Sequence, residues 1–296
     1  MLAFWVLLSS VAFAPGNLLF DLSTLRQNVQ TGTVIQSQKR RLCGAFHFYR
    51  VIPNSKPHHL PPLIEAARGL GENVASLHFA SPVAFTYNPL EYAWAPHAEY
   101  LYRFGQSHKR VVFLGMNPGP FGMVQTGIPF GEVAAVREWL GISAPVNQPA
   151  HQHPKRPILG FDCPRSEVSG RRLWSLFAAR FKSADAFFKD HFVANYCPLA
   201  FVEESGANRT PDKLPTSERD PLFAACDLHL RRMLEILQPE WIIGVGAFAA
   251  TRAAEVAGEL KIQSGQILHP SPASPLANRD WSGTVTRQLV TLGVWR

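Results

Sequence analysis

Two polar residues that could take part in chemistry each follow a short apolar run. Asn117 lies in Gly115-Met-Asn-Pro-Gly-Pro-Phe-Gly-Met123, and His269 opens the segment His-Pro-Ser-Pro. An amide oxygen can position a water molecule, and an imidazole can donate a hydrogen bond to a developing negative charge. Because glycine and proline restrict the backbone around both, we expect the two side chains to be aimed into a site. The simpler alternatives are a turn asparagine and a structural histidine.

Two further residues could recognise a flat, polar ligand. Asn195 ends the apolar run Phe192–Ala194, where a buried amide is costly unless it is hydrogen-bonded. Its partner is either neighbouring backbone or a ligand with adjacent donor and acceptor atoms, such as an imide edge. Phe130 stands between Pro129 and Gly131 and could stack on a planar ring, although core packing is the default for phenylalanine.

Several polar segments could contact phosphate. Ser271 offers a hydroxyl and a backbone N–H, and Thr210-Pro211 has the form of a helix N-cap followed by a first-turn proline. Lys155 and Arg156 belong to a basic loop interrupted by proline, which is either a phosphate contact or a solvated surface. The net charge of +7 permits a polyanionic partner without proving one.

The elements that must position these residues alternate along the chain. Apolar runs predict strands at 111–114, 192–196, 241–245 and 266–269. Amphipathic patterns predict helices at 63–68, halted near Gly69 and Gly71, and at 132–140, 170–181, 221–237 and 247–257. Strands that alternate with helices indicate an α/β fold with a parallel sheet covered on both faces, and ligands bind such sheets at the carboxyl ends of the strands.

The first 62 residues are expected to be an amino-terminal extension to a catalytic domain at 63–296. This extension is either disordered or the result of a start upstream of the true one. Residues 1–14 are apolar and carry no charged side chain, which leaves a targeting signal open, but they are too few to cross a bilayer as a helix. We expect no association with a membrane.

The sequence gives little support for a metal site or a nucleotide cofactor. The four cysteines stand far apart, so we expect inert thiols and no metal. Gly244-Val-Gly246 matches the start of a dinucleotide-binding pattern, but no strand ending in an acidic residue follows about 20 residues on. We interpret it as a close strand–helix turn and expect no cofactor.

Taken together, the motifs resemble the single-strand-selective monofunctional uracil-DNA glycosylases, within the uracil-DNA glycosylase superfamily. The resemblance runs from about residue 63 to the end. The segments that carry it are Tyr87–His97, Gly115–Met123, Thr126–Val133, His153–Pro157, Ser166–Gly170, Asn195–Leu199 and His269–Pro272.

The resemblance implies a three-layer α/β/α sandwich with a short, mainly parallel central sheet. It also implies roles for individual residues. Asn117 would orient the attacking water, and His269 would stabilise the departing uracil. The base would be bound by Met116, Gly119, Met123, Phe130 and Asn195, with Gly119 and Met123 near C5, where 5-hydroxymethyluracil is tolerated.

The expected partner is DNA that contains uracil or oxidised pyrimidines. The implied DNA contacts are Ser205, Gly206, Asn208, Arg209, Thr210, Pro211, Lys155, Arg156, Ser271 and Arg279. Ala273 stands where some relatives have a basic residue, which leaves strand preference open. The expected enzyme is a monomeric, monofunctional hydrolase that leaves an abasic site, nuclear if the organism is eukaryotic. The alternatives are a catalytically silent binder of damaged DNA and a nucleotide-dependent oxidoreductase.

Overall fold

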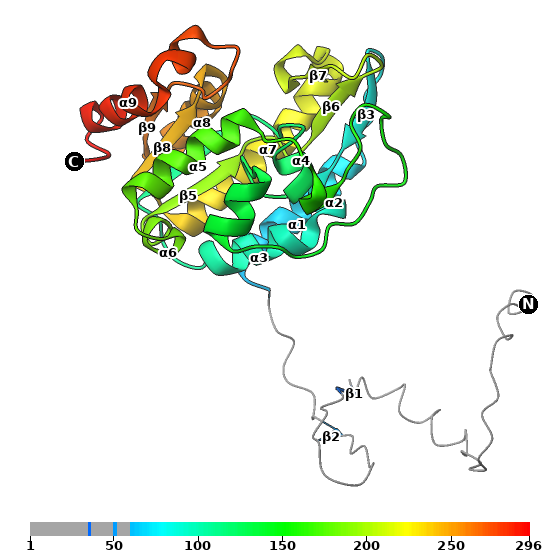
Figure 1. Cartoon of the computed structure of the whole chain (residues 1–296), viewed down its shortest axis with the longest axis horizontal. Helices are drawn as coiled ribbons and strands as arrows, with labels where there is room; N and C mark the ends of the chain where they lie inside the picture. The colour runs from blue at the N-terminus through cyan, green and yellow to red at the C-terminus, as the bar shows by residue number, and fades with distance from the viewer. Residues whose placement is uncertain (1–34, 37–49, 52–59) are drawn as a thin grey trace, which may run out of the picture. The chain divides into compact units, whose positions relative to one another are not determined.

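The computed structural model describes residues 35–36, 50–51 and 60–296 (Figure 1). The chain divides into two compact units, Met1–His59 and Leu60–Arg296. In the first unit, β1 (Ile35–Gln36) pairs antiparallel with β2 (Arg50–Val51). The rest of the predicted extension up to residue 59 lies outside the described residues. None of the described helices is both long and apolar enough to cross a membrane.

The second unit is built on a parallel sheet with strand order β5-β4-β8-β9. Its strands are β4 (Val111–Gly115), β5 (His191–Asn195), β8 (Trp241–Val245) and β9 (Gln263–Ile267). Every residue of β4 is buried, as expected for a central strand of a sheet that is covered on both faces. The register places Gly115 beside Asn195, so the ends of β4 and β5 meet at one edge.

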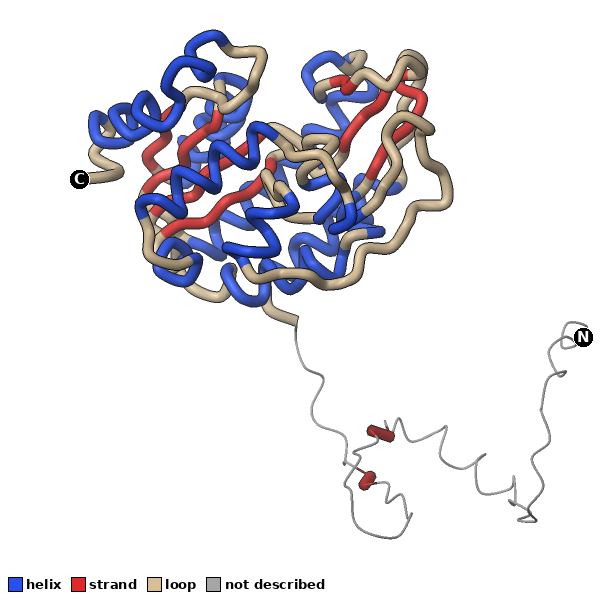
Figure 2. Tube along the Cα trace, viewed as in Figure 1, coloured by secondary structure: helices blue, strands red, loops and turns tan. Residues whose placement is uncertain are grey.

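Helices cover both faces of this sheet. On one face the ring of Phe113 packs 5.0 Å from that of Phe177 in α5 (Val168–Arg180). On the other, a side chain at Gly244 would lie 2.2 Å from the backbone nitrogen of Ala250 in α8 (Ala247–Leu260), so the glycine allows strand and helix to touch. In Figure 2 the red strands of the parallel sheet lie between blue helices. The predicted α/β sandwich is confirmed, and close packing accounts for Gly244.

The remaining elements complete the unit. They are α1 (Pro62–Ala75), α2 (Pro89–Tyr92), α3 (Trp94–Phe104), α4 (Met123–Thr126), α6 (Ala184–Phe188), α7 (Thr216–Leu237) and α9 (Pro275–Thr291), a π-helical segment (Ala135–Leu140) and two 3-10 turns (Gly160–Asp162 and Pro211–Lys213).

A second, antiparallel sheet was not predicted. Its order is β3-β6-β7, formed by Val83–Tyr87, Ala200–Glu203 and Asn208–Arg209. At its edge the hydroxyl of Tyr87 donates to the carbonyl of Arg156 at 2.7 Å and accepts from the N–H of His153 at 2.8 Å. These bonds fix the basic loop beside the strands that carry residues 200–209.

Several element predictions were wrong in extent or kind. Helix α7 begins at Thr216 instead of Pro221, and α8 ends at Leu260 instead of Ala257. Helix α1 continues through Gly69 and Gly71 to Ala75, because Gly71 faces Leu90 so closely that an added Cβ would lie 3.2 Å away. Packing thus outweighs the low helix propensity of glycine. The last strand ends at Ile267 instead of His269, which frees the histidine for a loop. The predicted helix at 132–140 is π-helical over Ala135–Leu140.

Candidate active site

A cavity of about 440 Å³ lies at the carboxyl ends of the parallel strands. Asn195 and Val245 end β5 and β8 and line it directly. All of the predicted catalytic and base-binding residues line this cavity: Met116, Asn117, Gly119, Met123, Phe130, Asn195 and His269. The structure therefore brings together residues that the sequence separates by more than half of the chain.

The amide of Asn117 is anchored on one side only. Its Nδ2 donates to the carbonyl of Leu199 at 3.3 Å, in the loop that follows β5. This bond uses the nitrogen and leaves Oδ1 as an acceptor. An anchored amide oxygen can hold a water molecule in place, but it cannot take up a proton as a strong base would.

The ring of His269 is held in one tautomer. The backbone N–H of Ser271 donates to Nδ1 at 3.1 Å, so a neutral ring carries its proton on Nε2. Burial lowers the pKa of His269, which favours this neutral form. The ring packs against Gly246, whose φ is +93° and where an added Cβ would lie 3.1 Å from the Cβ of His269. His269 is thus a neutral, fixed donor through Nε2.

Asn195 and Phe130 lie together over Gly115. A Cβ on Gly115 would fall 2.4 Å from Oδ1 of Asn195 and 2.5 Å from Cε2 of Phe130. Nδ2 of Asn195 meets the sulfur of Met123 at 3.2 Å, and a thioether is a weak acceptor. The simple alternative of an amide satisfied by a neighbouring backbone is not what the structure shows, so the amide can exchange this contact for a ligand.

The backbone of Phe130 is strained and clamped. Its φ of 53° lies in the left-handed region, which is uncommon for a residue with a large side chain. Its carbonyl accepts from Nε1 of Trp174 at 3.0 Å and from the N–H of Glu132 at 2.7 Å. Strain that is held in this way is typical of functional sites.

Sequence reasoning missed several residues of the cavity wall, among them Glu167, Ser169 and Phe248. Glu167 is the only carboxylate among the described residues that line the cavity. Its Oε2 accepts from the N–H of Phe121 at 3.1 Å, and burial raises its pKa. The segment Ser166–Gly170 carries part of the resemblance, but its sequence alone indicates no role in the site.

The predicted DNA-binding residues fall into two groups. Asn208, Thr210 and Ser271 line the cavity. The others lie outside it, and among them Arg279 is exposed on α9. Outside the cavity, Nζ of Lys155 donates to the carbonyl of Ser205 at 3.1 Å, and Nε of Arg156 donates to that of Gly206 at 2.9 Å. The basic loop and the segment at 205–206 therefore form one surface.

Two of these predictions were wrong in detail. The N–H of Ser271 binds His269 and its hydroxyl accepts from the N–H of Ala273 at 3.1 Å, so this backbone N–H is not free for phosphate. Thr210 makes no side-chain cap, and Pro211 opens a single 3-10 turn. The turn cannot continue because Leu214 precedes Pro215 and adopts extended backbone, with ψ of 149°.

Three other residues that were predicted to bind DNA are partly or wholly withdrawn from the surface. Pro211 and Gly206 are buried. The guanidinium of Arg209 is held by Glu203 at 2.8 Å and by the carbonyl of Lys213 at 2.7 Å.

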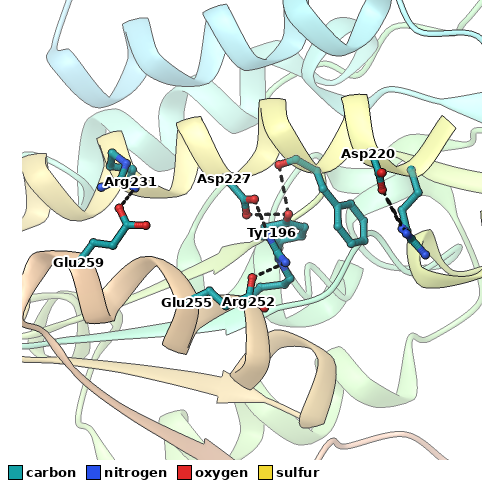
Figure 3. A network of polar contacts seen from close by, with 9 residues as sticks. Tyr196, Asp220, Asp227, Arg231, Arg252, Glu255 and Glu259 are labelled. Atoms are coloured by element: carbon teal, nitrogen blue, oxygen red, sulfur yellow. Dashed lines mark hydrogen bonds and ion pairs between the residues drawn. The ribbon is translucent and has the colours of Figure 1, made fainter. Parts of the chain in front are cut away.

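A polar network connects Tyr196, the residue that follows β5, with helices α7 and α8 (Figure 3). The hydroxyl of Tyr196 donates to Oδ1 of Asp227 in α7 at 2.8 Å. Asp227 also pairs with Arg252 of α8, which in turn pairs with Glu255. Because Tyr196 follows Asn195 directly, this network fixes the backbone from which Asn195 reaches the cavity.

Comparison with known proteins agrees with this geometry. The family model of the uracil DNA glycosylase superfamily matches residues 102–288. The chain is 46% identical over 227 residues to the single-strand selective monofunctional uracil DNA glycosylase of Bos taurus, covering 76% of this chain and 84% of that protein. The protein of the same name from Mus musculus is also 46% identical, over 78% of this chain and 84% of its own length.

Solved structures share the fold at lower identity. The crystal structure of wild-type SMUG2 from Pedobacter heparinus has a TM-score of 0.58 and 17% identity, over 78% of this chain and 97% of that one. At this identity the likeness concerns the fold alone. The family match and the identity to curated relatives together show that the chain belongs to the uracil DNA glycosylase superfamily, within its single-strand selective monofunctional family.

Proposed function

We propose that the protein is a monofunctional uracil-DNA glycosylase, which hydrolyses the N-glycosidic bond of uracil in DNA and leaves an abasic site. One observation carries the proposal. A water-positioning amide, Asn117, and a neutral histidine donor, His269, line the same cavity as Asn195 and Phe130, which suit a planar imide. The named relatives in other organisms carry this activity in their names.

The chemistry follows from the charges that develop. Breaking the bond leaves positive charge on the sugar and negative charge on the departing base. The Nε2–H of His269 donates to the carbonyl oxygen that becomes anionic, a stabilisation that is usually the largest single contribution. Oδ1 of Asn117 accepts a hydrogen bond from the attacking water and aims it at the sugar carbon. The phosphates of the DNA add negative charge near the cationic sugar.

Two side chains recognise the uracil base, one by hydrogen bonds and the other by stacking. The amide of Asn195 gives up its weak contact with Met123 for the donor and acceptor edge of uracil, and Phe130 stacks on the ring. Since a stacked base cannot reach the cavity, the nucleotide must be flipped out. No lysine is among the described residues that line the cavity, which supports hydrolysis over a Schiff-base lyase step.

The surface beside the cavity suits a DNA strand. Phe121 has the guanidinium groups of Arg165 and Arg156 over its ring, at 3.9 and 5.4 Å from its centroid. Lys155 is exposed next to them. Cations gathered beside a pocket favour the phosphates that flank a flipped nucleotide.

The substrate range and the oligomeric state belong to the proposal as well. We propose that pyrimidines with an oxidised substituent on C5, such as 5-hydroxymethyluracil, are accepted near Gly119, beside the carboxylate of Glu167, which lies 2.6 Å from the position of an added Cβ on this glycine. A monomer suffices, because one chain supplies every residue of the mechanism.

The test is release of uracil from a labelled oligonucleotide, read as strand cleavage after alkali. His269→Leu and Asn117→Ala should each lower the single-turnover rate by about 100- to 1,000-fold while DNA affinity changes far less. The exposed His78→Leu is a matched control that should leave the rate unchanged. Equal losses of rate and affinity would contradict the assigned roles. DNA binding without any alkali-labile site in the wild type would favour the silent binder.

A further inference from the structure

Arg172 in α5 reaches across to the loop that carries His269. Its Nη1 donates to the carbonyls of Pro270 and Ser271 at 3.0 and 3.3 Å. Its Nη2 donates to Oδ1 of Asn278 in α9 at 2.8 Å, and Nδ2 of Asn278 donates to the carbonyl of Pro272, also at 2.8 Å. The half-buried guanidinium therefore joins α5, α9 and the loop between β9 and α9.

The contact with Pro270 matters because of the geometry of one peptide unit. The carbonyl of Pro270 and the N–H of Ser271 belong to the same planar amide, in which the two groups point in opposite directions when the bond is trans. Arg172 holds the carbonyl end of this amide, and Nδ1 of His269 accepts from the N–H end. One guanidinium thus fixes the plane that orients the histidine.

We infer that Arg172 is a positioning residue that sets the tautomer of His269 through the Pro270–Ser271 peptide. If this peptide turned over, its carbonyl would face Nδ1 and favour a proton there. Nε2 would then present a lone pair to the cavity instead of a donor. The guanidinium opposes that turn because its hydrogen bond to the carbonyl of Pro270 would be lost, and bonds to a charged donor are the stronger kind. The consequence for catalysis rests on the proposed function.

The test compares Arg172→Met, which removes the donors but keeps the stem, with Arg171→Met on the exposed side of the same helix. Both are made in the full chain. The first measurement is the ¹⁵N spectrum of the histidine rings without DNA, in which the signals of His269 are assigned by their loss in His269→Leu. The wild type and Arg171→Met should show a protonated Nε2 and an unprotonated Nδ1. Arg172→Met should show protonation shifted toward Nδ1.

The second measurement is the single-turnover rate of uracil release together with the affinity for DNA. Arg172→Met should lower the rate by about 10- to 100-fold, by analogy with partners that orient metal-bound histidines, and should change the affinity for DNA much less. Arg172→Lys keeps a cation that can reach one carbonyl, so its rate should lie between those of the wild type and Arg172→Met. If Arg172→Met does not fold, the same spectra and rates of Arg172→Lys decide the question.

The outcomes separate the two proposals. Wild-type ring signals in Arg172→Met would overturn the inference, and so would a slower rate with an unchanged tautomer. A wild type that never releases uracil would overturn the proposed function, while the ring spectra would still decide whether Arg172 sets the tautomer.

Discussion

Replacing Gly115 by alanine should block base recognition without touching either catalytic residue. Gly115 ends β4 beside Asn195. The new methyl would lie 2.4 Å from Oδ1 of Asn195, where ordinary contact begins at 3.4 Å. The side chain of Asn195 must therefore move by about 1 Å. The other neighbour, Phe130, cannot give way easily, because its backbone is clamped by Trp174 and its ring lies 2.5 Å from the same methyl.

A displacement of this size has a predictable effect on rate and stability. A shift of about 1 Å in a positioning group can cost about 100-fold in rate, so we expect a loss of that order in kcat/KM for uracil release. Overpacking a filled site typically costs about 1–3 kcal/mol of unfolding free energy. The assays are alkali-dependent cleavage of a uracil-containing oligonucleotide and urea unfolding followed by circular dichroism.

Gly69→Ala is the matched control, since it adds the same methyl at a position with nothing within 4 Å. In helix α1 this change should raise stability by up to about 1 kcal/mol and leave the rate unchanged. A Gly115→Ala protein that releases uracil at the wild-type rate would refute the placement of Asn195 and Phe130 over this glycine. A loss of rate fully explained by unfolded protein would contradict the predicted loss of base recognition in the folded enzyme.

Two further predictions concern stability. Burial lowers the pKa of three histidines (His97, His191 and His229) from 6.5 to about 4. Between pH 6.5 and 4 the unfolded chain therefore binds more protons than the folded chain. The free energy of unfolding should fall as the pH drops through this range, by about 3 kcal/mol for each ring that titrates independently. A urea midpoint that does not change over this range would contradict the prediction. Asp227→Ala should cost about 2 kcal/mol, because it removes the partly buried carboxylate that Arg252 and Tyr196 share. Glu259→Ala breaks only an exposed pair with Arg231 (Figure 3) and should cost less than about 1 kcal/mol. Equal urea midpoints for the two variants would count against this difference.

The parts of the site that the sequence could predict are the ends of buried parallel strands. Asn117 and Asn195 each follow or end an apolar run, and the carboxyl ends of parallel strands share one edge of a sheet. His269 follows β9, which is less apolar, and for this strand the predicted range of 266–269 lies two to three residues after the observed one, Gln263–Ile267. The rigid segment His-Pro-Ser-Pro nevertheless marked the residue, because prolines restrict a loop whatever strand precedes it.

The parts that the sequence could not predict depend on partners far away in the chain. Strand β3 pairs with β6, more than a hundred residues later, and the exposure of its residues follows no regular alternation. Gly71 sits within a helix because Leu90 needs the space, which no local propensity reports. Glu167 enters the cavity wall from the start of α5 and would look like an ordinary surface acid in the sequence.

Ser271 shows most clearly why residue types alone mislead at a site. A serine after His-Pro offers a hydroxyl and an N–H, and both suit phosphate as long as nothing nearer competes for them. The structure supplies nearer partners: Nδ1 of His269 takes the N–H, and the carbonyl of the same amide is held by Arg172, 98 residues earlier in the chain. The direction of one peptide plane therefore decides whether this segment binds DNA backbone or orients the histidine. Since that plane is set by a contact between α5 and a distant loop, only the folded chain can reveal it.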